Sequence, residues 1–251
     1  TGVQTCALPI SEIEEILALT KALKRICPDK AYTVRVNDRA ILKGMADYSG
    51  FPENETDKVF IILDKMDKIG LDGVREELLA EGYAPEAVEK YTGLLAEIQN
   101  DAAGVRALGE KLSGVMDPAK AENLATIMET VKAVADIEFG LEFDPTLVRG
   151  MGYYTGTIFE VSMEGFGGSV AGGGRYDKLI GKFTGVDTPA CGFSIGFERI
   201  ITILMDSGFK VPEAAGKKAF LYEKGLSGEQ FRAVLKKAQE ERANGTRVAV
   251  A

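Results

Sequence analysis

The sequence predicts an α+β protein, in which a sheet is interrupted by a helical stretch and followed by the opening of an α/β unit. Three observations indicate this fold class. Alternation of apolar and polar residues, typical of half-buried strands, occurs at residues 32–36, 157–161 and 193–197. Residues 52–137 show almost only helical periodicity. After Pro212, a strand, a helix and a strand succeed one another as in a βαβ unit.

The composition is that of a globular chain and excludes several kinds of site. The 251 residues are 45% hydrophobic and 27% charged, and no run of 18 apolar residues could cross a membrane. With 38 acidic and 30 basic residues, the net charge of −8 argues against a broad cationic surface for nucleic acid, although a local patch could bind it. The absence of histidine excludes a histidine base or metal ligand. Three scattered cysteines match no zinc spacing and fit a reducing cytoplasm.

The first ten residues differ in character from the rest. Residues 1–10 read TGVQTCALPI, which is what a common sequencing-adapter oligonucleotide encodes, and they lack the basic and apolar regions of a signal peptide. We expect them to be an adapter-derived scar, with a short native loop as the alternative. Ser11 and Glu14 then predict a capping box that begins a helix, which Pro28 ends. A strand from Tyr32 and a short helix follow.

The remaining elements follow from the same patterns. The helical stretch has three amphipathic stripes and no chemical motif; the stripes cover residues 59–69, 85–98 and 124–134. The later elements are strands at Thr157–Val161 and Phe193–Phe197, a strand at Ala219–Tyr222, a helix capped by Ser227, and a strand at Arg247–Val250. Because the chain stops inside this βαβ unit, we expect its C-terminus to be truncated.

Three segments carry chemistry, and the first joins an arginine to two tyrosines. Arg149 lies between Val148 and Gly150, and Tyr153 and Tyr154 follow it. A guanidinium binds phosphate or carboxylate in a bidentate manner, and phenols give hydroxyls and flat walls. A structural Arg-Tyr network is an equally good interpretation of this segment alone.

The second and third segments are rich in glycine. Thirteen of the 29 glycines lie between Gly150 and Gly196. Gly172, Gly173 and Gly174 would let a strand approach a ligand closely, and the Arg175 and Asp177 that follow favour a structural pair. No Lys-Ser/Thr follows, which excludes a P-loop. In the third segment, strand alternation gives Gly192, Ser194 and Gly196 one flat face for a stacked heterocycle, and Arg199 then begins a helix suited to phosphate.

Together these three segments resemble the two histidine-specific motifs and motif 3 of the histidyl-tRNA synthetases, in the family's order. Tyr32–Leu42 resembles the strand and helix that follow motif 2 in that family. The resemblance implies a class II synthetase-like mixed, largely antiparallel sheet with a helical insertion, followed by the start of an α/β anticodon-binding domain. It divides the chain into residues 1–10 (scar), 11–51 (catalytic core, part), 52–137 (helical insertion), 138–212 (catalytic core with the histidine-specific motifs and motif 3) and 213–251 (truncated anticodon-binding domain).

The resemblance also implies roles for individual residues. Arg149 would contact the α-phosphate and the histidine carboxylate; Tyr153 and Tyr154 would line the histidine pocket. Gly172, Gly173 and Gly174 would floor that pocket. Arg199 would hold the γ-phosphate of a bent ATP beside Gly192 and Gly196. The implied substrates are L-histidine, ATP as its Mg²⁺ complex and tRNA(His), with no tightly bound cofactor, no protein metal ligand and no membrane. The parent enzyme would be a cytoplasmic homodimer.

Two departures from the family pattern accompany the resemblance. Met151-Gly152 stands where the family often has Leu-Asp before the tyrosines. Motifs 1 and 2, which in the family supply the dimer interface and a second phosphate-binding arginine, are absent. We therefore expect the 251-residue chain to be inactive alone. The alternatives are a histidine-sensing regulatory subunit of ATP phosphoribosyltransferase, a catalytically dead paralogue on the same core, and an interaction module whose glycines only serve turns.

Overall fold

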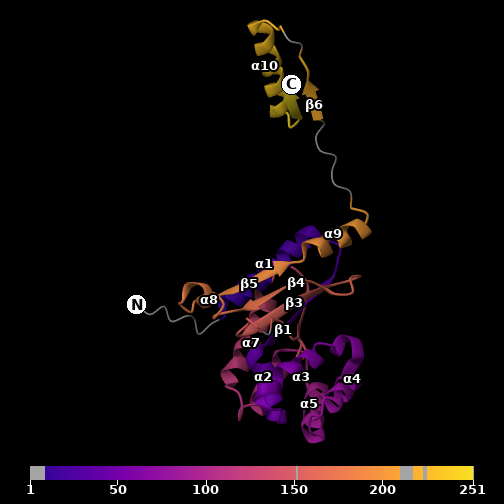
Figure 1. Ribbon diagram of the computed structural model, residues 1–251, viewed down its shortest axis with the longest axis vertical. Coiled ribbons are helices and arrows are strands. Elements are labelled where there is room, and N and C mark those ends of the chain that lie inside the picture. The colour runs from indigo at the N-terminus through magenta and orange to yellow at the C-terminus, as the bar shows by residue number, and fades with distance from the viewer. Residues whose placement is uncertain (1–8, 151, 210–216, 223–224, 251) are drawn as a thin grey trace. The chain divides into compact units, whose positions relative to one another are not determined.

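A computed structural model describes residues 9–150, 152–209, 217–222 and 225–250 (Figure 1). The chain divides into two compact units, one ending at Ile203 and one beginning at Leu204. Most of the expected scar, Met151 and the predicted boundary between residues 212 and 213 lie outside the described residues. None of the helices in the described ranges is long and apolar enough to cross a membrane.

The first unit is built on a five-stranded sheet in the order β2-β1-β3-β4-β5. β1 pairs with β2 in parallel, and the other neighbouring pairs are antiparallel, so the predicted mixed, largely antiparallel sheet is confirmed. The strands are β1 (Tyr32–Asp38), β2 (Gly140–Phe143), β3 (Thr157–Met163), β4 (Ser169–Arg175) and β5 (Cys191–Ile195). Their order brings the three predicted segments together, because β3, β4 and β5 are adjacent.

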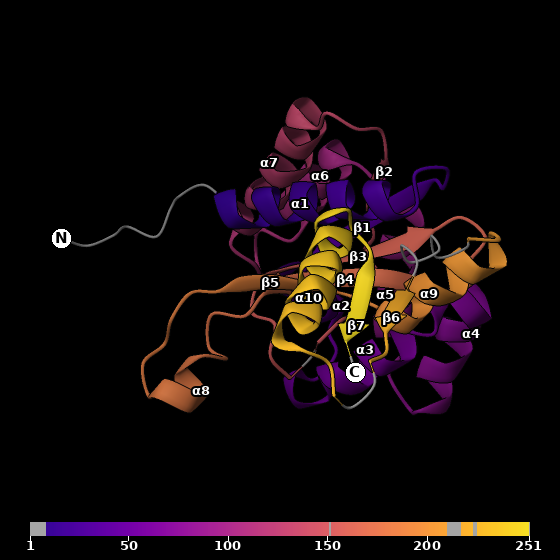
Figure 2. The same cartoon turned by 90° about the horizontal axis from the view of Figure 1, so that it is seen from above.

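The two faces of this sheet differ in character. Val34, Val36, Phe159 and Val161 are buried on one face, where apolar side chains exclude water. Helices α1 (Ile10–Ile26) and α7 (Pro118–Val134) contact β5 and β1 respectively (Figure 2). The opposite face carries glycines and charged side chains and is the face of the candidate site.

The predicted capping box at Ser11 is wrong. Helix α1 begins at Ile10, with Pro9 at the N-cap, two residues before the predicted cap, and without a side-chain cap hydrogen bond. Ser11 therefore lies inside the first turn, where its hydroxyl is not at the capping position. The helical stripe is as expected, since Ile13, Ile16 and Leu23 are buried.

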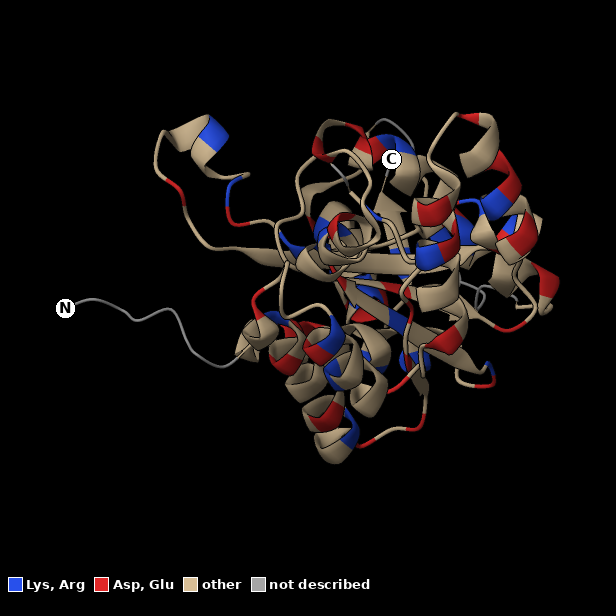
Figure 3. Ribbon diagram, turned by 90° about the horizontal axis from the view of Figure 1, so that it is seen from below, with Lys and Arg blue, Asp and Glu red and all other residues tan. Residues whose placement is uncertain are grey.

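Residues 53–134 form a 3₁₀ turn and five α-helices, with charges of both signs interspersed along them (Figure 3). The predicted single stripe from Val59 to Ile69 is broken, because one helix ends at Leu63 and the next begins at Met66. Gly70 interrupts the second helix with φ 68°, a conformation that glycine adopts at little cost. The helices are α3 (Thr56–Leu63), α4 (Met66–Ala80), α5 (Pro85–Glu97), α6 (Ala102–Lys111) and α7.

The second unit contains the expected βαβ arrangement. β6 (Lys217–Phe220) and β7 (Arg247–Val250) pair in parallel, and α10 (Gly228–Ala243) connects them. Ser227 caps α10 in a reciprocal capping box with Gln230, as its sequence position predicts. The first strand begins and ends two residues earlier than predicted.

Candidate functional site

The candidate site lies on the polar face of β3, β4 and β5. The strand registers pair Glu160 with Gly172 and Gly172 with Ser194. Paired residues of neighbouring strands project from the same face, so these three positions share it. The segments singled out from the sequence are therefore neighbours across three strands, although 22 residues separate Gly172 from Ser194 along the chain.

Gly172 provides the surface on which Arg149 lies. A Cβ atom at Gly172 would be 2.7 Å from Cζ of Arg149 and 2.8 Å from the carbonyl oxygen of Phe159. Any larger residue would displace the guanidinium or the neighbouring strand. Arg149 comes from the loop before β3, and its Nη1 donates to Oε2 of Glu160. The structure thus holds the arginine against bare backbone, with a carboxylate as its hydrogen-bond partner.

The other two glycines of β4, Gly173 and Gly174, lie on opposite faces of the sheet and have different neighbours. A Cβ atom at Gly174 would be 3.1 Å from Cδ1 of Tyr154, so Gly174 shares the face of Gly172. At Gly173 it would be 2.2 Å from the carbonyl oxygen of Gly192 and would also meet the Phe159 ring. Gly173 therefore permits close packing on the apolar face, whereas Gly172 and Gly174 face the site.

A tyrosine cluster adjoins the arginine. The ring centroids of Tyr153 and Tyr154 are 4.4 Å apart, and that of Tyr176 is 6.3 Å from Tyr154. The turn depends on Gly150, whose φ is 56° and whose carbonyl oxygen accepts from the backbone N–H groups of Tyr153 and Tyr154. Burial raises the pKa of Tyr154 to about 12, so its hydroxyl remains a hydrogen-bond donor at neutral pH.

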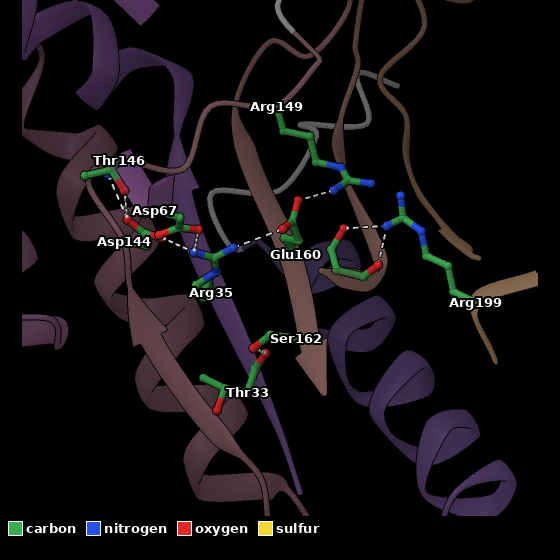
Figure 4. A network of polar contacts seen from close by, with 10 residues as sticks. Thr33, Arg35, Asp67, Asp144, Thr146, Arg149, Glu160, Ser162 and Arg199 are labelled. Carbon is green, nitrogen blue, oxygen red and sulfur yellow. Dashed lines mark hydrogen bonds and ion pairs between the residues drawn. The ribbon is translucent and has the colours of Figure 1, made fainter. Parts of the chain in front are cut away.

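Arg199 lies at the far end of the same face (Figure 4). It is in the first turn of α9 (Phe197–Asp206), as predicted, and its Nη1 donates to the carbonyl oxygen and the hydroxyl of Ser169. A Cβ atom at Gly196 would be 3.1 Å from Cδ of Arg199. The arginine is exposed, so a phosphate group could reach its guanidinium.

The predicted flat face around Gly192 is partly covered. A Cβ atom at Gly192 would be 2.3 Å from the Tyr176 hydroxyl oxygen, so this side chain closes that end. The strand also ends at Ile195, earlier than predicted, and Phe197 is a helical residue that is 73% exposed. The N–H of Gly196 still donates to the carbonyl oxygen of Val170 at 2.8 Å, and helix α9 begins at the next residue.

The sequence did not single out the charged partners of Arg149. Glu160 accepts from Arg149 through one oxygen and from Arg35 through the other, and Arg35 also contacts Asp144 and Asp67. Charged residues in the middle of half-buried strands were the available signal, because Arg35 and Glu160 are direct partners in the β1–β3 register. The predicted pair of Arg175 and Asp177 is confirmed at 2.9 Å.

Comparison with known proteins gives the family. The model of the family described as histidyl-tRNA synthetase matches residues 7–200. A histidine–tRNA ligase of Leifsonia xyli is 42% identical over 208 residues, covering 80% of this chain and 46% of that protein. A histidine–tRNA ligase of Aeropyrum pernix is 39% identical over 184 residues, covering 70% of this chain and 40% of that protein.

Solved structures have the same fold. A histidyl-tRNA synthetase from a Nostoc species matches with a TM-score of 0.74 at 25% identity, over 96% of this chain and 57% of that one. A Bacillus halodurans protein described as an ATP phosphoribosyltransferase regulatory subunit/histidyl-tRNA synthetase matches with a TM-score of 0.69 at 22% identity, over 96% and 58%. The chain spans about half the length of the curated relatives it matches. It belongs to the histidyl-tRNA synthetase family.

Proposed function

We propose that the natural-length protein containing this chain activates L-histidine with ATP and transfers it to tRNA(His). The observation that supports this most is the placement of Arg149, Tyr154 and Arg199 over one glycine-lined sheet face. Two separated guanidinium groups suit a ligand with two anionic ends, and the half-buried phenol of Tyr154 suits a polar ring. The relatives named histidine–tRNA ligase agree with this reaction.

In the first step of the proposed reaction, a carboxylate oxygen of histidine attacks the α-phosphorus of ATP, and pyrophosphate leaves. Arg149 would lie against the reacting carboxylate and α-phosphate and stabilise the charge that develops there. Arg199 would bind the γ-phosphate, and Tyr154 would donate to the imidazole. In the second step, a terminal hydroxyl of the tRNA attacks the carbonyl carbon, AMP leaves, and the hydroxyl proton passes to a phosphate oxygen of the leaving AMP. Positioning and charge stabilisation carry both steps, so the chain requires no histidine base.

ATP would enter as its Mg²⁺ complex, and the ion would supply further charge neutralisation on the phosphates. In the described part of the chain, no group of three or more Cys, Asp or Glu side chains could hold a metal ion. We propose that the ion enters bound to the nucleotide phosphates. A homodimer, an anticodon-binding role for residues 213–251, a tRNA-facing helical insertion and a cytoplasmic location belong to the same proposal.

Histidine-dependent exchange of pyrophosphate into ATP tests the proposal in the natural-length protein. We expect Arg149→Lys to lower kcat by about 100-fold or more, since a lysine keeps the charge but loses the planar fork. Arg106→Lys is the control, because Arg106 likewise donates to carboxylates but lies between α6 and α7, away from the candidate site. Equal activity of Arg149→Lys and the unvaried protein would contradict the proposal.

The 251-residue chain should show no histidine-dependent exchange on its own, since motifs 1 and 2 are absent from it. Detection of exchange by the purified chain would contradict this expectation. The alternative of a histidine-sensing regulatory subunit draws support from the Bacillus halodurans match. That alternative predicts that the natural-length protein binds histidine without pyrophosphate exchange or charging of tRNA.

A further inference from the structure

A chain of ion pairs runs from Arg149 to the helical insertion (Figure 4). Oε2 of Glu160 accepts from Arg149, and Oε1 of the same carboxylate accepts from Nη2 of Arg35 at 3.1 Å. Nη1 of Arg35 donates to Asp144 at 3.2 Å and to Asp67 of α4 at 3.0 Å. Both oxygens of Glu160 are therefore occupied by guanidinium groups on opposite sides.

The inner ion pairs of this series are partly buried, whereas its outer end, at Asp67, is in solvent. The side chains of Glu160 and Arg35 are 16% and 23% exposed, whereas that of Asp67 is 68% exposed. Asp144 is held in turn by the backbone N–H and the hydroxyl of Thr146, at 2.8 and 2.6 Å. Paired charges in a partly buried place keep their geometry, and a solvated partner adds little.

We propose that Glu160 and Arg35 are positioning residues for Arg149, with Glu160 holding the guanidinium over Gly172 and Arg35 holding Glu160. The inference rests on the proposed function of Arg149. Gly172 has no side chain to hold the arginine from below, so a lateral carboxylate sets its position along the strand. Arg35 is the direct partner of Glu160 in the β1–β3 register, which fixes the carboxylate from the next strand.

The shared carboxylate makes one substitution diagnostic. Glu160→Gln keeps the size of the side chain but replaces one oxygen with an NH₂ group. Because each oxygen faces a different arginine, that NH₂ group must point at a guanidinium, donor against donor. Arg35→Lys is the milder change, since an ammonium keeps the charge but cannot fork between Glu160 and Asp144.

Kinetics of histidine-dependent pyrophosphate exchange in the natural-length protein test the proposal. We expect Glu160→Gln to lower kcat about 100-fold and to leave the KM for ATP within about threefold, because a displaced Arg149 affects the reacting centre and Arg199 would still hold the γ-phosphate. Arg35→Lys should give a smaller loss of kcat, and Asp67→Asn should lower kcat less than about threefold.

Glu122→Gln and Arg106→Lys are the controls, because they disrupt another, more exposed arginine–carboxylate cluster, on α6 and α7. Pyrophosphate exchange involves no tRNA, so both variants should keep kcat in this reaction, whatever they do to the midpoint of thermal unfolding. Unchanged kcat in Glu160→Gln, or an equal loss in Glu122→Gln, would overturn the positioning role. If the unvaried protein shows no exchange, the proposed function fails.

Crystal structures of the unvaried protein and of Glu160→Gln test the geometry without any reaction. The positioning role requires that the Arg149 guanidinium lie over Gly172 in the first structure and leave it in the second. An unmoved guanidinium in Glu160→Gln overturns the inference even where the exchange reaction is present.

Discussion

At the scale of single residues, the candidate site depends on glycines, which have no side chain, as much as on its arginines and tyrosines. Gly172 and Gly150 leave room for Arg149 and Tyr154, and the sequence indicated Gly172 as a place of close approach. It did not indicate that Gly173 faces the apolar side, because that depends on the register of the strand. Glycine content thus indicated which part of the chain forms the candidate face, and the strand register decided which glycine lies on it.

The fold changes the pKa of the Asp38 carboxyl. Burial raises its pKa to about 6, although hydrogen bonds from the Ala40 N–H and the Thr157 hydroxyl act in the opposite direction. In the unfolded chain the pKa of this carboxyl is about 3.9. The folded state therefore binds this proton more tightly, and the stability that the group contributes is lost as the pH rises from about 4 to about 6.

We therefore expect the unvaried protein to lose more thermal stability between pH 4.5 and pH 7 than Asp38→Asn does. Asparagine keeps the cap on α2 (Arg39–Ser49) without a titrating group. Between pH 4.5 and pH 7, the unfolding midpoint of the unvaried protein should fall by about 5 °C more than that of Asp38→Asn. Thermal scans of both proteins at the two pH values measure it, and equal shifts would show that Asp38 does not carry the effect.

At the level of elements, the sequence predicted those whose pattern is set locally. The strand from Tyr32, the helix from Pro85 and the helix capped by Ser227 have the expected positions. The start of α1 and the end of β5 differ by one or two residues, because tertiary hydrogen bonds decide where an element ends. Ion pairs between elements far apart in sequence have no local pattern and were not predicted.

One such ion pair ties α1 to β4. Glu12 is 1% exposed, and its two oxygens accept from Nε and Nη2 of Arg175 at 2.6 and 3.0 Å. We expect Glu12→Ala to destabilise the protein by about 3 kcal/mol, since it leaves a partly buried guanidinium without its main partner. Thermal unfolding against Glu14→Ala, an exposed residue of the same helix, measures the difference. Equal midpoints for the two variants would show that the pair contributes nothing.

Over the whole molecule, the sequence predicted the family from its three motifs and the fold class from its hydrophobic patterns. In the structure these motifs fall on or next to the adjacent strands β3, β4 and β5. The chain covers 46% of the Leifsonia xyli relative, and β5 forms one edge of the five-stranded sheet. Large apolar side chains of β5 and of the segments next to it in sequence are exposed; they are Phe183, Val186, Phe193 and Phe197. An open strand edge with exposed apolar side chains favours association between chains.

We expect the isolated 251-residue chain to self-associate at roughly micromolar to millimolar concentrations. Phe193→Lys should reduce this association by placing a charge on the open strand, whereas Leu79→Lys, on α4, should not. Light scattering over a concentration series measures the apparent mass. A monodisperse chain with one cooperative unfolding transition would contradict the expectation.

The tyrosine cluster has a practical consequence. The chain contains eight tyrosines and no tryptophan, so its intrinsic fluorescence comes from phenol rings alone. Tyr153 and Tyr154 lie close enough, at 4.4 Å between centroids, to exchange excitation energy. A ligand that separates or stacks on these rings alters the emission from the site itself, so the chain carries its own optical reporter of occupancy.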